Sequence, residues 1–143
     1  MPIIGYYYDK ILMEKNKKVE SDLQVKNKVQ ITDIEESDLP FKEKGRSTLK
    51  FKFNFELLFE PKIGKIVFNG HILYMEDEKI IKDILKSYKK DKKLPQEITL
   101  QILNTILYKA HLKALDLGNE LNLPAHLPIP KISPKANIKD YIG

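Results

Sequence analysis

One segment alternates apolar and polar residues almost without a break, and this pattern constrains the fold more than any other feature. From Leu49 to Phe59 every second residue is Leu or Phe, and the residues between are Lys, Asn and Glu, with Leu58 as the exception. Successive side chains of a strand point to opposite faces, so the pattern predicts a strand with one dry face and one wet face. Such a strand is typical of an antiparallel sheet.

Three further segments complete a predicted four-stranded sheet. Turn residues occupy 61–64, and alternation resumes over Ile66–Tyr74, which predicts a long hairpin. Earlier strands are expected near Leu23–Ile34 and over Gly5–Glu14. The charged connection Glu35–Ser47, which contains Pro40 and Gly45, is expected to be a loop or a ragged edge.

After Met75 the apolar period changes from two to about 3.6, which indicates helices. A short helix is predicted over Ile80–Tyr88, and a long one from Pro95 to Leu121 with proline at its first position. The prolines that follow exclude a helix or a central strand. The sequence therefore predicts a single α+β domain, 1–143: a four-stranded antiparallel sheet followed by a short and a long helix, with 122–143 as an extended proline-containing tail.

The apolar arc of the long helix is wider than one sheet face requires. Two explanations stay open: a deeply buried core helix, or a helix with one stripe on its own sheet and the other on a partner subunit. The second explanation predicts an oligomer interface at these residues: Ile98, Ile102, Leu103, Ile106 and Leu107.

The charge of the chain is basic but poor in arginine. Lysine and arginine total 25 against 20 acidic residues, a net charge of +5, and Arg46 is the only arginine. Specific nucleic-acid interfaces rely heavily on arginine, whereas lysine mixed with glutamate is typical of thermophile surfaces. A nucleic-acid partner is therefore disfavoured. It is kept as the alternative, a basic nucleic-acid-binding or scaffolding domain using lysines such as Lys50 and Lys52.

No constellation of residues in the sequence indicates catalysis. There is no cysteine, and His71, His111 and His126 are scattered without metal-ligand spacing. Neither a phosphate-binding loop nor a nucleophile elbow occurs. We therefore predict a protein that is not an enzyme and has no cofactor and no metal. The first residues do not resemble a signal peptide, and no stretch approaches the roughly 20 apolar residues of a membrane span, so a cytoplasmic location without membrane insertion is expected.

Apolar groups in unusual places indicate a binding surface instead. Tyr6, Tyr7 and Tyr8 put aromatic rings on both faces of one strand, and Leu58 interrupts the polar face of another. The proline-containing tail adds further apolar side chains. Core filling or a dimer seam explains each of them singly, but together they suggest binding of extended polypeptide or of another subunit.

The order of elements resembles that of the SecB family of protein-export chaperones. The similarity runs from Val25 to Ile132 and includes Leu121-Asn122-Leu123-Pro124, which looks like the family's Leu-Asn-Leu-x-Pro stretch. The resemblance implies an ATP-independent holdase that binds unfolded polypeptide clients in apolar grooves, assembles as a homotetramer (a dimer of dimers), and has a link to protein export. The family is typically acidic, whereas this chain is net positive. The residues expected to bind peptide are Tyr6, Tyr8, Leu58, Leu123, Leu127 and Ile129.

Overall fold

The computed structural model describes residues 3–19, 22–37 and 44–142, and it has the α+β architecture that the sequence predicts. Four strands come first and two helices follow them. Their bounds are β1 Ile3–Lys15, β2 Gln24–Ser37, β3 Arg46–Glu60, β4 Gly64–Asp77, α1 Glu78–Asp91 and α2 Gln96–Glu120, with a short 3-10 helix, η1, at Ile138–Tyr141.

The four strands form one antiparallel sheet in the order β1-β4-β3-β2. The predicted hairpin is confirmed as β3 and β4, with Phe55 opposite Phe68. In the segment expected to be a loop or a ragged edge, β2 continues to Ser37 and β3 begins at Arg46. Ladder pairing on β3 extends these strands beyond their expected ends, and residues 38–43 lie outside the described part of the chain.

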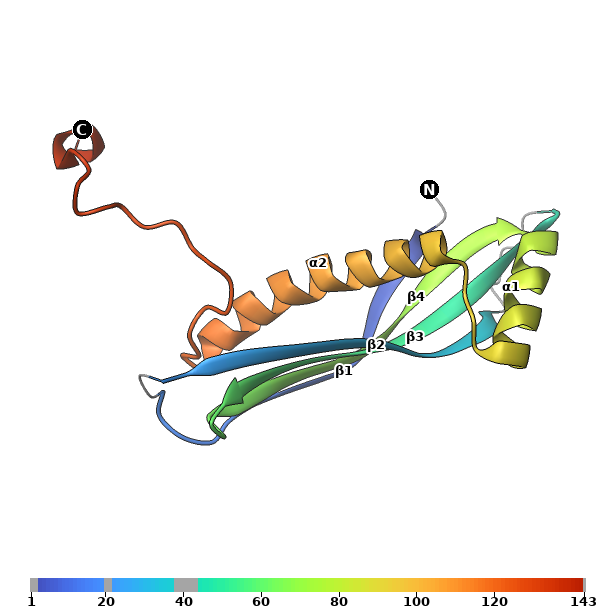
Figure 1. Cartoon of the computed structure of the whole chain (residues 1–143), viewed down its shortest axis with the longest axis horizontal. Coiled ribbons are helices and arrows are strands. Elements are labelled where there is room, and N and C mark those ends of the chain that lie inside the picture. The colour runs from blue at the N-terminus through green and yellow to red at the C-terminus, as the bar shows by residue number, and fades with distance from the viewer. Residues whose placement is uncertain (1–2, 20–21, 38–43, 143) are drawn as a thin grey trace.

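The core lies between one face of the sheet and the two helices. All six alternating apolar residues of β3, from Leu49 to Phe59, are at most 2% exposed. Figure 1 shows α2 lying along this face of the sheet and α1 at one end of it. The buried positions of α2 recur every fourth residue: Ile102, Ile106, Ala110, Ala114 and Gly118. The last three are small, so the second half of α2 can approach the sheet closely.

The burial of α2 corrects part of the predicted oligomer interface. Ile102 and Ile106 have no exposed surface and belong to the core of their own chain. Ile98, Leu103 and Leu107 are half-buried. A wide apolar arc shows that a helix has two apolar sides, but not which of them faces the sheet. Here the side that contains Ile102 and Ile106 faces it.

The chain after α2 is held at two points before it leaves the body. Leu123 is buried, and its backbone N–H donates a hydrogen bond to the Gly118 carbonyl at 2.9 Å. The ring of His126 then meets that of His111 on α2, with 2.8 Å between Nε2 of His126 and Nδ1 of His111. Figure 1 shows the following residues leading away from the sheet towards η1.

Neither α1 nor α2 is long and apolar enough to cross a membrane, nor is any other helix in the described ranges.

We predict opposite effects on the free energy of unfolding when each of two glycines is replaced by alanine. At Gly70, on β4, an added Cβ would collide with the Tyr7 carbonyl oxygen and would lie 2.7 Å from the Phe53 ring. We expect Gly70→Ala to lower the free energy of unfolding by about 1–3 kcal/mol through overpacking. At Gly118 the nearest atoms lie 3.6 and 3.8 Å away, so Gly118→Ala should raise it by up to about 1 kcal/mol through helix propensity. Urea unfolding measures both, and a Gly70→Ala variant as stable as wild type would contradict the close approach of β1 and β4.

The contact between His111 and His126 predicts a loss of stability in acid. Burial, followed by the nearby His111, lowers the pKa of His126 to about 4, and burial lowers the pKa of His111 as well. A histidine whose folded-state pKa is depressed contributes stability above its unfolded pKa of about 6.5, and this stability is lost as the pH falls towards the folded value.

We expect wild type to lose about 1–2 kcal/mol more of unfolding free energy between pH 6.5 and pH 4 than His126→Asn, allowing for the partial exposure of the ring. Carboxylates titrate in both proteins, so the difference between the two pH profiles isolates the histidine. Parallel profiles would show that His126 carries no such coupling.

Candidate functional site

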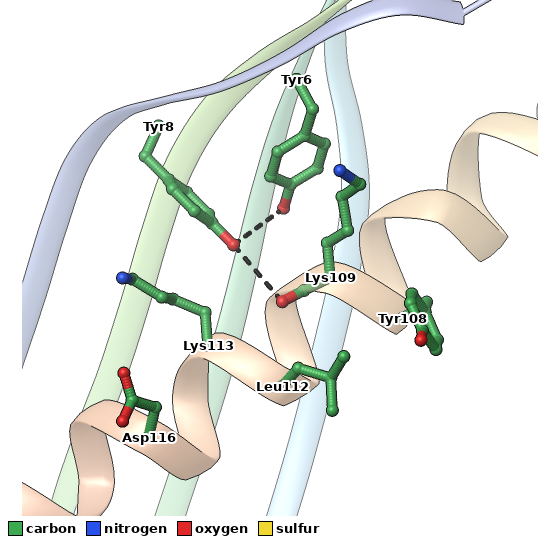
Figure 2. Close-up of a pocket in the computed structure, with 7 residues that line it drawn as sticks. All are labelled: Tyr6, Tyr8, Tyr108, Lys109, Leu112, Lys113 and Asp116. Carbon is green, nitrogen blue, oxygen red and sulfur yellow. Dashed lines mark hydrogen bonds between the residues drawn. The ribbon is translucent and has the colours of Figure 1, made fainter.

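An open groove of about 480 Å³ lies between the edge strand β1 and helix α2. Figure 2 shows the rings of Tyr6 and Tyr8 extending from β1 towards α2. The side chains of Lys109 and Lys113 extend from α2 on the side of these rings, and those of Tyr108 and Leu112 lie on the other side of the helix. The α2 residues that line the groove are Tyr108, Lys109, Leu112, Lys113 and Asp116. Most of the surface within the groove is apolar.

The alternation of β1 places Tyr6 and Tyr8 on the face of the sheet that carries the core. The ring of Tyr6 stacks on Phe53 with 5.3 Å between centroids, and the ring of Tyr8 lies 5.0 Å from that of Phe68. Tyr7 points to the opposite face, where it is 49% exposed and stacks on His71. The core aromatics thus hold the two groove tyrosines from behind, which fixes one wall of the groove.

A chain of hydrogen bonds joins the tyrosines to α2. The Tyr6 hydroxyl donates to the Tyr8 hydroxyl at 3.2 Å, and the Tyr8 hydroxyl donates to the backbone carbonyl of Lys109 at 3.4 Å. Burial raises the pKa of Tyr6, with the Tyr8 hydrogen bond as a second cause, and burial also raises the pKa of Tyr8. Both hydroxyls therefore stay neutral at physiological pH, and this wall of the groove carries no charge.

The α2 side of the groove combines exposed apolar groups with charged ones. Tyr108 is 70% exposed and Leu112, one turn further along, is 50% exposed. Lys109 holds its ammonium 5.2 Å from the centre of the Tyr6 ring, within cation–π range. Lys113 and Asp116 complete the lining. An apolar floor with a charged rim suits an extended chain whose apolar side chains enter the groove while its backbone stays near water.

Sequence reasoning identified Tyr6 and Tyr8 but missed Tyr108 and Leu112. These two residues are four positions apart and therefore share one face of α2. That spacing was the available signal. This face lies outside the wide apolar arc of α2, on the side of the helix that was expected to be polar.

The other four residues expected to bind peptide lie outside this groove. Leu58 is half-buried on the opposite face of the sheet, beside Glu60, Lys62 and other polar residues. Leu123 is only 6% exposed and belongs to the core. In the tail, Leu127 is half-buried and Ile129 is 58% exposed. The structure therefore brings together two of the six residues.

The lysines of the alternative function, Lys50 and Lys52, lie on the sheet face away from the helices. Both reach Glu35 on the neighbouring strand, with nitrogen–oxygen distances of 3.8 and 3.5 Å respectively. All three side chains are partly solvent-exposed, so these ion pairs contribute little to stability. The Glu35 carboxylate nevertheless reduces the positive electrostatic potential at this surface, and with it the attraction to the phosphates of a nucleic acid.

Comparison with known proteins finds a similarity of fold but no similarity of sequence. No protein-family model and no curated protein matches the chain. Among solved structures, a SecB-like chaperone of Mycobacterium tuberculosis, in complex with a ChAD peptide from the HigA1 antitoxin, is similar with a TM-score of 0.51 and 10% identity. The match covers 94% of this chain and 91% of that one. The likeness confirms the predicted α+β fold, a four-stranded antiparallel sheet followed by two helices, as that of a SecB-like structural neighbour.

Proposed function

We propose that this protein is an ATP-independent holdase chaperone that binds unfolded polypeptide in the groove between β1 and α2. The observation that carries the proposal is the groove itself, an open and mostly apolar groove with a neutral tyrosine wall, which the exposed Tyr108 and Leu112 border on α2. The SecB-like neighbour was solved with a bound peptide, which supports a polypeptide ligand for this fold.

The mechanism is passive. An apolar client segment that enters the groove loses contact with water, and each anchored side chain contributes roughly 1–3 kcal/mol. Binding lowers the concentration of free unfolded chain, so aggregation slows without any input of nucleotide energy. The resemblance to SecB supports protein export as the setting in which such clients arrive.

Self-association through α2 belongs to the same proposal. Leu103 is half-buried and lies outside the set of apolar residues packed on the core. With Leu107, four positions further along α2, it forms an apolar surface that a second subunit would cover. Ile98, also expected at the interface, packs against the core of its own chain. The SecB resemblance makes a dimer of dimers the expected assembly.

Two leucines of α2 provide a matched pair of variants for the client groove. Leu112 lines the groove and Leu100 does not, yet each is 50% exposed on the same helix. The two residues are separated by about 18 Å along the helix axis. We expect Leu112→Ser to weaken the binding of a denatured model protein by about five- to thirtyfold, which corresponds to about 1–2 kcal/mol.

Leu100→Ser should change client affinity by less than about twofold, and both variants should melt at the same temperature because their helix-propensity and exposure changes are equal. Fluorescence titration and suppression of aggregation measure the effect in proteins matched for mass by light scattering. Equal affinities for the two variants would place the client elsewhere and would refute the groove.

The predicted assembly is tested by mass. Light scattering at micromolar concentration should give four times the 16.7 kDa of one chain. Leu103→Lys should reduce this mass, because a charge in a desolvated seam costs several kcal/mol, while circular dichroism should show that the fold is retained. A wild-type mass of 16.7 kDa would contradict the tetramer, and an unchanged mass in Leu103→Lys would move the interface away from this part of α2.

A further inference from the structure

His111 and His126 face each other where the tail crosses α2. The distance from Nδ1 of His111 to Nε2 of His126 is 2.8 Å, and the ring centroids lie 5.0 Å apart. The centroid separation is close to the nitrogen–nitrogen distance plus two ring radii, so the two nitrogens point at one another instead of lying in stacked rings. The ring of Phe55 on β3 stands edge-on to His111 at 5.0 Å and supplies an apolar backing.

The protonation state of this pair suits metal binding. Burial lowers the pKa of both histidines, that of His126 to about 4, so both rings are neutral at pH 7. Neutral imidazole is the form that ligates metal ions. One of the two facing nitrogens carries the proton of the present hydrogen bond. Both rings are only partly buried, so that proton can move to a ring's outer nitrogen through water, with no net loss of a proton.

The distance between the nitrogens also suits a shared ion. Two imidazole nitrogens bound at about 2.0–2.1 Å to one ion, at an angle of 90–109°, lie about 2.9–3.4 Å apart. The observed separation of 2.8 Å is only slightly shorter. The two rings, whose nitrogens now point at one another, would have to turn so that both lone pairs point at the ion.

We propose that His111 and His126 form a two-histidine site for a divalent transition-metal ion. The described residues hold no cluster of three or more potential ligands, so water would supply the remaining positions. Among first-row divalent ions Cu²⁺ binds nitrogen ligands most tightly, and it is therefore the probe of choice. Bound metal would fasten the start of the tail to α2. The proposal is independent of the client groove, because metal binding is measured without a client.

The test is a titration of the full chain with Cu²⁺ by calorimetry, with electron paramagnetic resonance as a second readout. Wild type should bind one equivalent, with two nitrogen ligands in the spectrum. His111→Ala and His126→Ala should each weaken binding by about tenfold or more and leave one fewer nitrogen. The control is His71→Ala, since His71 pairs with Asp9 at 2.8 Å on another part of the surface. It should bind as wild type does.

Melting curves with and without Cu²⁺ separate a loss of metal binding from a loss of folding in the variants. Saturating Cu²⁺ should raise the melting temperature of wild type and of His71→Ala, because an ion that binds only the folded state stabilises it. It should not raise that of His126→Ala or of the milder variant His126→Gln. An absence of binding by wild type, equal binding by wild type and His126→Ala, or loss of binding in His71→Ala would overturn the proposal. The second outcome would mean an adventitious ion only, and the third would place the ion at His71.

Discussion

The apolar face of β3 and β4 must be shielded from water, and α2 shields it. The way in which α2 packs on this face determines the rest of the structure. Alternating Leu, Phe and Ile residues make this face apolar from one end to the other. The aromatic rings on this face stabilise the folded chain only when they are buried away from water. Ala110, Ala114 and Gly118 let the second half of the helix settle close to those rings. The rotation of α2 about its axis is thereby fixed, and so is the set of side chains that it turns outward.

The groove is a geometric consequence of this packing. The outer strands of a four-stranded sheet lie about 14 Å apart, whereas a helix with its side chains is about 10–12 Å wide. One helix therefore leaves part of the sheet uncovered, and here that part lies beside the edge strand β1. Tyr6 and Tyr8 partly fill the gap. On one side their rings pack against the core rings of Phe53 and Phe68. On the other side the Tyr6 hydroxyl donates to that of Tyr8, which donates to a backbone carbonyl of α2.

The sequence predicted those parts that depend on periodicity, and it failed where the rotation of a helix decided the outcome. Strict alternation was enough to predict β3, its hairpin with β4 and the common face of Tyr6 and Tyr8. The apolar arc of α2 could not say which side was core, so Ile106 was assigned to a partner and Tyr108 was overlooked. The meeting of His111 with His126 depends on an irregular turn at Asn122, and no periodic pattern encodes such a turn.

The chain beyond His126 has a long reach. If all 15 residues from Pro128 to Ile142, η1 included, took the polyproline conformation at about 3.1 Å per residue, they would span about 46 Å, more than the roughly 38 Å length of α2. Ile129, Ile132, Tyr141 and Ile142 on this segment are 58–71% exposed. Such a segment behaves as a tethered ligand. The effective concentration at which its apolar side chains would meet the surface of their own chain is set by the length of the tether and not by the number of molecules in solution.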